Sequence, residues 1–197
     1  MVTWVYIDSC AWNRLCKCGV DLAVELPADR YQLAITREVQ IELQRFRESK
    51  PESEVLPYIE QALGASQVET SSWFGFAMHD SDGNLSAYQP YGGFDVGTWQ
   101  SDKERTWLSQ AAVLAMLAKS PNKKGPLGAN QADASQGARA FDAVIVTNEL
   151  KVRKPKGPLQ LAWEQGGHVV FLREVEASGL GLDAFIAGGH AFARIAL

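Results

Sequence analysis

Two acidic side chains follow apolar segments of the chain, where buried strands are expected to end. Asp8 comes directly after Val5–Ile7, and Glu149 follows Val144–Val146 after two polar residues. In open α/β sheets, ligands bind at the carboxyl ends of the strands. We therefore expect both carboxylates to lie at one edge of a sheet, beside a bound ligand.

A third and a fourth acid fall on predicted helices. On the helix predicted over 37–48, Glu42 shares a face with the apolar residues Val39, Leu43 and Phe46. An acid within such a stripe is costly unless it is paired or binds a cation. Asp133 lies near the start of a helix of small residues predicted over 131–141, where an acid interacts favourably with the helix dipole.

Each acid alone also has a purely structural interpretation. Asp8 could cap a turn, Asp133 could be an ordinary helix-start acid, and Glu149 could be a solvated loop residue. Glu42 could pair with a nearby arginine. Taken together, carboxylates without an accompanying His or Cys cluster favour a hard cation, Mg²⁺ or Mn²⁺. Such an ion supports hydrolysis of a phosphodiester bond.

These acids must be positioned by alternating strands and helices. Short apolar segments predict strands at 2–7, 32–35, 143–146 and 168–172. Helices are predicted at 37–48, with Thr36 as the N-cap, and at 51–64, 102–119, 131–141 and 158–165. This alternation predicts an α/β fold, a three-layer α/β/α sandwich around a mostly parallel sheet.

The length of 197 residues suits one domain. Residues 65–101 interrupt the alternation, because aromatic residues stand there among Gly, Ser, Asp and Asn without a clear period. We therefore predict a single domain over 1–197 that carries an aromatic-rich insertion at about 65–129. Its aromatic side chains could stack on unpaired bases, or form a small additional core or a partner interface.

Composition excludes several classes of protein. The formal net charge of −4 argues against a protein held to nucleic acid or membrane by bulk charge. No apolar run approaches the ~20 residues of a membrane span, and no signal peptide is visible at the start. Three cysteines bunched in one short segment, Cys10, Cys16 and Cys18, do not form a disulfide framework. We therefore expect a reducing, cytoplasmic location without membrane contact.

Four segments resemble, in the same order, the PIN-domain nucleases, a family that includes the ribonuclease toxins of bacterial toxin–antitoxin pairs. They are VYIDS at 5–9, ITREVQIEL at 35–43, NQADASQGARA at 130–140 and VIVTNE at 144–149. The resemblance covers about 1–48 and 130–172. Cys10 departs from it, because a small polar residue is more typical there, and Glu149 stands where Asp is commoner. Asp142 is a competing third acid that fits the spacing less well.

The resemblance implies an endoribonuclease that depends on Mg²⁺ or Mn²⁺. Its metal-binding and catalytic acids would be Asp8, Glu42, Asp133 and Glu149. The resemblance also implies that Ser9 and Thr147 orient these ligands through their hydroxyls, with Asn130 as a further supporting group. RNA, an antitoxin protein at the active site and a second copy of the chain are the implied partners.

A basic segment directly follows Glu149. Its side chains are candidates for contact with the RNA backbone, or belong to a solvated connection: Lys151, Arg153, Lys154 and Lys156. Lys123 and Lys124 are further candidates. Two other interpretations stay open, a non-catalytic RNA- or protein-binding module with the PIN fold, and a redox site formed by the three cysteines.

Overall fold

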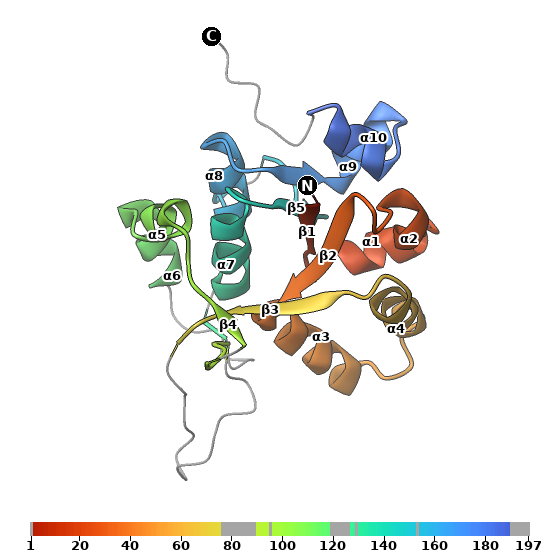
Figure 1. The fold of residues 1–197 in the computed structure, drawn as a ribbon, viewed down its shortest axis with the longest axis horizontal. Helices are drawn as coiled ribbons and strands as arrows, with labels where there is room; N and C mark the ends of the chain where they lie inside the picture. Colours follow the sequence, from red (N-terminus) through yellow and green to blue (C-terminus); the bar gives the residue numbers. More distant parts are fainter. Residues whose placement is uncertain are drawn as a thin grey trace.

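A parallel sheet forms the centre of the computed structural model, which describes residues 2–75, 90–94, 96–118, 127–128, 130–152 and 154–189. Its strands are β1 (Thr3–Ile7), β2 (Tyr31–Thr36), β3 (Glu69–Trp73), β4 (Gly97–Thr98), β5 (Val144–Thr147) and β6 (Val169–Phe171). The strand order is β4-β3-β2-β1-β5-β6, and every neighbouring pair is parallel (Figure 1).

Helices cover both faces of this sheet, which confirms the predicted three-layer α/β/α architecture (Figure 1). One face carries α1 (Ala11–Lys17), α2 (Leu22–Glu25), α3 (Arg37–Ser49), α4 (Val55–Ala65), α9 (Leu172–Ser178) and α10 (Leu182–Ala187). The opposite face carries α5 (Asp102–Leu108), α6 (Ala111–Leu117), α7 (Gln131–Arg139) and α8 (Pro158–Glu164).

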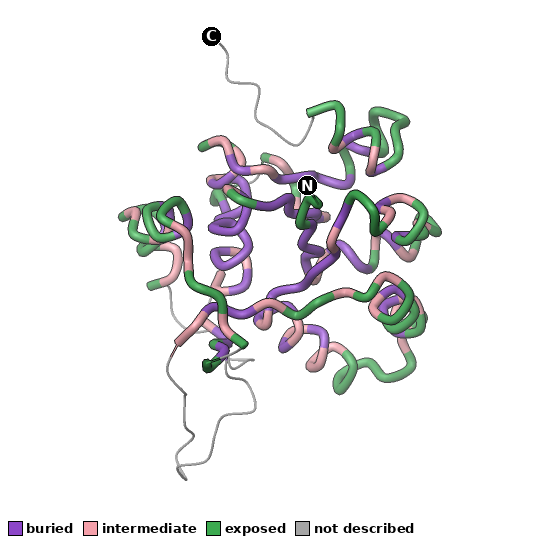
Figure 2. Tube along the Cα trace, viewed as in Figure 1, coloured by how far each residue is buried: buried purple, intermediate pink, exposed green. Residues whose placement is uncertain are grey.

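The central strand β1 contributes to a core on each face. Val5 and Ile7 pack into the cluster beneath α1 to α4, whereas Tyr6 packs into the cluster beneath α5 to α8. Because both faces are covered, the inner strands are apolar almost without alternation. Figure 2 shows this as a buried centre surrounded by exposed helix surfaces.

The connections reverse direction at β1. From β1 the chain proceeds outward through β2, β3 and β4, and it then returns to β5 on the other side of β1. Val5 is thus in register with Leu33 of β2 and with Val144 of β5. Such a reversal places the carboxyl ends of β1 and β5 beside a crevice, the usual ligand position in open parallel sheets.

Three predicted elements differ from the structure. The helix expected at 51–64 begins only at Val55, whose N–H donates to the Ser53 hydroxyl. The helix expected at 102–119 is broken into α5 and α6, since the Ser109 hydroxyl bonds the Thr106 carbonyl and Gln110 is extended. Residues 65–101, expected to leave the main fold, contribute β3 and β4 to the sheet. Residues 76–89 and 119–126 of the predicted insertion lie outside the described residues.

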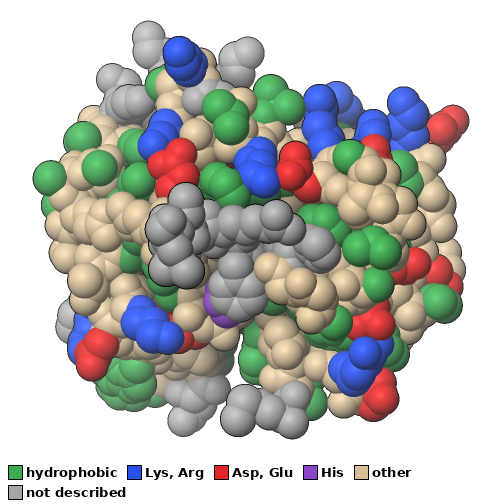
Figure 3. Space-filling model, turned by 90° about the horizontal axis from the view of Figure 1, so that it is seen from above, with side chains coloured by type: hydrophobic (Ala, Val, Ile, Leu, Met, Phe, Trp, Pro, Cys, Tyr) green, Lys and Arg blue, Asp and Glu red, His purple; other side chains and the backbone are tan. Residues whose placement is uncertain are grey.

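Charged side chains of both signs are distributed over the face seen in Figure 3, where Lys and Arg stand beside Asp and Glu. This mixed surface agrees with the small net charge. Within the described part of the chain, none of the helices is both long and apolar enough to span a membrane.

Candidate functional site

Asp8 lies at the carboxyl end of β1, at the point where the strand order reverses. Its side chain is only 2% exposed. Its backbone N–H donates to the Val146 carbonyl of β5 at 2.9 Å, and its carbonyl accepts the Ala11 N–H of α1 at 3.0 Å. The turn from β1 into α1 therefore holds the Asp8 carboxylate at the edge of β5, as the sequence predicts.

Two neutral donors orient this carboxylate. The Thr147 hydroxyl, at the end of β5, donates to Asp8 Oδ2 at 2.7 Å, and the Cys10 thiol donates to the same oxygen at 2.9 Å. Burial, and then the Asp8 charge, raise the pKa of the Cys10 thiol, so Cys10 stays a protonated donor. Both bonds fall on the same carboxylate oxygen, Oδ2.

Glu42 brings a second carboxylate to this edge. The Thr36 hydroxyl caps α3 by accepting the Val39 N–H at 3.3 Å, so the helix starts where β2 ends. Burial raises the pKa of Glu42, and the charges of Asp8 and Glu38 act in the same direction. The Ser9 hydroxyl and Arg45 oppose this shift in the pKa of Glu42. Glu42 and Asp8 therefore repel each other at close range.

A surface pocket of about 290 Å³ opens beside this acidic pair. It lies where the start of α1 meets α3 and α4, and it is lined by Ser9, Cys10, Asn13, Glu42, Leu43, Phe46 and Val55. Two of the predicted site residues, Ser9 and Glu42, are thus accessible from this pocket.

Glu149 and Asp133 complete the predicted set of acids. The Glu149 N–H donates to Thr147 Oγ1 at 3.1 Å, so Glu149 is tied to the hydroxyl that holds Asp8. Asp133 is half-buried in the first turn of α7. Because α7 leads into β5 and packs against α3 and β2, its first turn lies toward the carboxyl edge of the sheet. Hydrogen bonds thus join Thr147 to Asp8 and Ser9 to Glu42, and the backbone N–H of Glu149 reaches Thr147. Among the described residues, the four predicted acids do not gather into one metal-binding group.

Two further charged side chains, which the sequence patterns did not predict as part of the site, are buried next to it. Glu38 is 5% exposed and Arg139 of α7 is 6% exposed. Burial raises the pKa of Glu38, while its own backbone N–H, the Thr36 hydroxyl and the Arg139 charge lower it. The guanidinium lies over the rings of Tyr6 and Trp73, at 5.1 and 4.9 Å from their centroids. The sequence feature that could have indicated this buried charge is Arg139 itself, an arginine at the end of a helix of small residues over 131–139.

Asn130 and the basic segment have other contacts in this structure. The Asn130 side-chain amide donates to the Met116 carbonyl at 2.9 Å and so ties the start of α7 to α6. Lys151 pairs with Glu174 at 2.8 Å, and Lys156 pairs with Glu164. Lys154 is exposed. The other basic candidates, Arg153, Lys123 and Lys124, lie outside the described residues.

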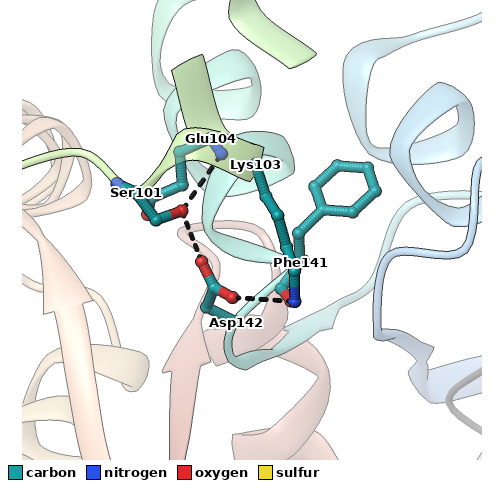
Figure 4. A network of polar contacts seen from close by, with 5 residues as sticks. All are labelled: Ser101, Lys103, Glu104, Phe141 and Asp142. Carbon is teal, nitrogen blue, oxygen red and sulfur yellow. Dashed lines mark hydrogen bonds and ion pairs between the residues drawn. The ribbon is translucent and has the colours of Figure 1, made fainter. Parts of the chain in front are cut away.

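Asp142, the competing third acid, belongs to a surface network after the end of α7 (Figure 4). Its carboxylate accepts the Ser101 hydroxyl at 2.6 Å and pairs with Lys103 at 3.3 Å. Ser101 in turn caps α5 through a capping box with Glu104. These contacts give Asp142 a structural role at the start of α5.

The three cysteines are free thiols. Burial raises the pKa of Cys18, and the carboxylate of Glu176 raises it further. Because the thiolate is the reactive species, a raised pKa opposes redox chemistry at Cys10 and Cys18.

Within the described residues, no three Asp, Glu, His or Cys side chains stand close enough to hold a metal ion by themselves. Mg²⁺ often takes only one or two protein carboxylates and fills its shell with water and substrate phosphate. Asp8 and Glu42 fit that donor set, because a cation would also relieve the repulsion between them.

Comparison with known proteins found no family model, no curated protein and no solved structure that matches this chain.

Proposed function

We propose that the protein is a ribonuclease that hydrolyses RNA phosphodiester bonds with the help of Mg²⁺ or Mn²⁺. The observation that carries this proposal is the buried carboxylate of Asp8 at the reversal point of the sheet, with Glu42 beside it. Two close carboxylates at the carboxyl edge of a parallel sheet suit a divalent cation and an anionic substrate.

The residues have distinct roles in this proposal. Asp8 and Glu42 would hold the cation, and the resemblance adds Glu149 and Asp133 as further ligands. When bound, Mg²⁺ activates water and stabilises negative charge on the scissile phosphate. The Thr147 hydroxyl keeps Asp8 in its orientation, and the Ser9 hydroxyl does the same for Glu42.

The resemblance to toxin ribonucleases supplies the rest of the proposal. It implies an antitoxin protein that covers the acidic edge, a homodimer and a cytoplasmic location. Contact of the RNA backbone with the segment after Glu149 rests on the positive charge of that segment. Lys154 and Lys156 are the described candidates that are exposed, and Lys156 also pairs with Glu164.

Cleavage of single-stranded RNA by the purified protein, with and without Mg²⁺ or Mn²⁺, tests this function. We expect the wild type to cleave RNA only when the metal is present. Asp8→Asn should lower the cleavage rate by more than roughly 100-fold, which is the loss expected from removing a group that only supports a metal ligand. The matched control is Asp142→Asn, because Asp142 is an exposed acid in a structural network. Equal activity of wild type and Asp8→Asn would overturn the proposal.

A non-catalytic module with the same fold is the second candidate. It is favoured by the lack of a three-acid cluster within the described residues. Binding of RNA without metal-dependent cleavage in the same assay would support it.

A further inference from the structure

We propose that the pocket beside Glu42 holds one unpaired nucleobase of the RNA. This inference rests on the proposed function and deepens it, because it assigns to the site a place for the base next to the scissile phosphate. The pocket lies between α1, α3 and α4, and it shares Glu42 and Ser9 with the acidic site. A group bound there is therefore adjacent to a phosphate at the acidic pair.

The lining of the pocket matches the chemistry of a base. One wall is apolar, formed by Leu43, Phe46 and Val55. The remaining lining residues form the polar side of the pocket, with the Asn13 amide, the Ser9 hydroxyl, the Cys10 thiol and the Glu42 carboxylate. Unpaired bases are bound by aromatic rings at their faces and by polar groups at their edges. An aliphatic side chain of a protein partner would leave the polar wall without hydrogen bonds.

The size and charge of the pocket agree with this occupant. A volume of about 290 Å³ is near the lower end for ligand sites, which suits one planar ring system rather than a duplex. Lys50 Nζ lies over the Phe46 ring, 5.8 Å from its centroid, and so places a positive charge next to the aromatic side chain of the pocket. Arg45 adds a second positive charge near Glu42. These cations complement the phosphates on either side of a bound base.

Asn13 is the residue that would distinguish one base from another. It lies on α1, and its side chain is exposed in this structure. An amide carries both a donor and an acceptor, so it can pair with the edge of a base. Phe46 would instead bind every base, because stacking is tolerant of sequence.

Kinetics on short single-stranded RNAs that differ at one position test the assignment. We expect Phe46→Leu and Phe46→Ala to raise KM roughly tenfold with little change in kcat, since stacking on one ring contributes that much per base. Asn13→Ala should change the ratio of kcat/KM values between bases. The matched control is Phe94→Ala, which removes an aromatic ring that is 83% exposed and lies beside β4.

Unchanged KM and base preference in the Phe46 and Asn13 variants would overturn the proposal, and so would a loss confined to Phe94→Ala. Release of a co-purified protein partner by Phe46→Leu, with RNA kinetics unchanged, would show that a protein side chain occupies the pocket. If the wild type cleaves no RNA, a second experiment tests the base pocket alone. Nucleoside monophosphates are titrated into the protein while the NMR signals of the Asn13 side chain are followed. Shifts that Phe46→Leu abolishes would support the base pocket without the nuclease, and the absence of shifts would overturn it.

Discussion

Helix α3 carries two glutamates into different environments. Near its start, Glu38 lies in the field of the Arg139 guanidinium, which is itself held between two aromatic rings. One turn later, Glu42 lies beside a second carboxylate, Asp8, which accepts hydrogen bonds only from neutral groups among the described residues. The first acid has a protein cation nearby, whereas the second leaves negative charge beside the surface pocket.

This difference distinguishes an acid with a nearby protein cation from the proposed metal ligand. Two carboxylates that repel each other gain free energy when a cation binds between them. The neutral donors on Asp8 fix its geometry without cancelling its charge, which is the arrangement expected of a metal ligand.

The largest predicted effect would break the structural half of this comparison. Arg139→Met removes the guanidinium that lies over the Tyr6 and Trp73 rings, so we expect the free energy of unfolding to fall by about 2 kcal/mol for each buried cation–π contact. The double variant Glu38→Gln with Arg139→Met should recover only the smaller electrostatic part of this loss, because neither charge then remains. Urea denaturation of the three proteins measures both effects. A single variant within about 1 kcal/mol of wild type would show that these contacts contribute little to stability.

Sequence patterns predicted four of the strands, β1, β2, β5 and β6, and the acids at their ends, because these depend on local order. Asp8 and Thr147 each follow an apolar segment, and parallel strands bring their carboxyl ends together. The Thr36 cap and the position of Glu42 follow from helical spacing alone.

The buried position of Arg139 near Glu38 could not be predicted in this way. It depends on how α7 packs over the sheet, with Arg139 reaching the rings of Tyr6 and Trp73. Short elements were also missed, namely α1, α2, α9 and α10, since one or two turns of helix give too little periodicity. β4, with two residues, gives no strand signal at all.

The second prediction tests whether the proposed site at Asp8 and Glu42 binds Mg²⁺. Mg²⁺ that binds only the folded protein should add about 2.7 kcal/mol of stability at a concentration of 100 times its Kd. Thermal unfolding of the wild type with and without Mg²⁺ measures the shift. The shift should disappear in Asp8→Asn and persist in Asp142→Asn, since Asp142 belongs to the α5 network. Equal shifts in all three proteins would place the cation elsewhere.

The third prediction concerns how the charge of Glu42 changes the stability of the protein with pH. The pKa of Glu42 is raised in the folded protein above its ordinary value of 4.5, so the folded state binds more protons than the unfolded state as pH rises above 4.5. Glu42 therefore lowers stability as pH increases through this range. Glu42→Gln should gain on the order of 1 kcal/mol over wild type at pH 7, a typical size for one substitution.

The gain from Glu42→Gln should vanish below pH 4.5, where Glu42 is protonated in both states. Denaturation curves at several pH values, without divalent metal, follow the difference. If the difference in stability between Glu42→Gln and the wild type is the same at all pH values, the charge of Glu42 does not destabilise the folded protein. At pH 7 the variant should also lose the stabilisation by Mg²⁺, so stability and metal binding move in opposite directions.

The smallest predicted effect concerns the Cys10 thiol, which donates a hydrogen bond to Asp8 at the end of β1. Cys10→Ser keeps a donor to Asp8 Oδ2, whereas Cys10→Ala removes it. We expect Cys10→Ser to change stability by less than about 0.5 kcal/mol, and Cys10→Ala to lose about 1 kcal/mol, the net contribution of one hydrogen bond. RNA cleavage should survive in both variants, because Thr147 still holds Asp8.

The same pair of variants separates the nuclease from the redox interpretation. If the cysteines formed a redox site, serine would abolish activity as completely as alanine, since neither can be oxidised. If Cys10 only orients Asp8, serine must behave like the wild type, and mild oxidant must leave the Cys10→Ser protein as active as before. The raised pKa of the Cys10 thiol favours the second outcome, because a protonated thiol donates to Asp8 but does not react.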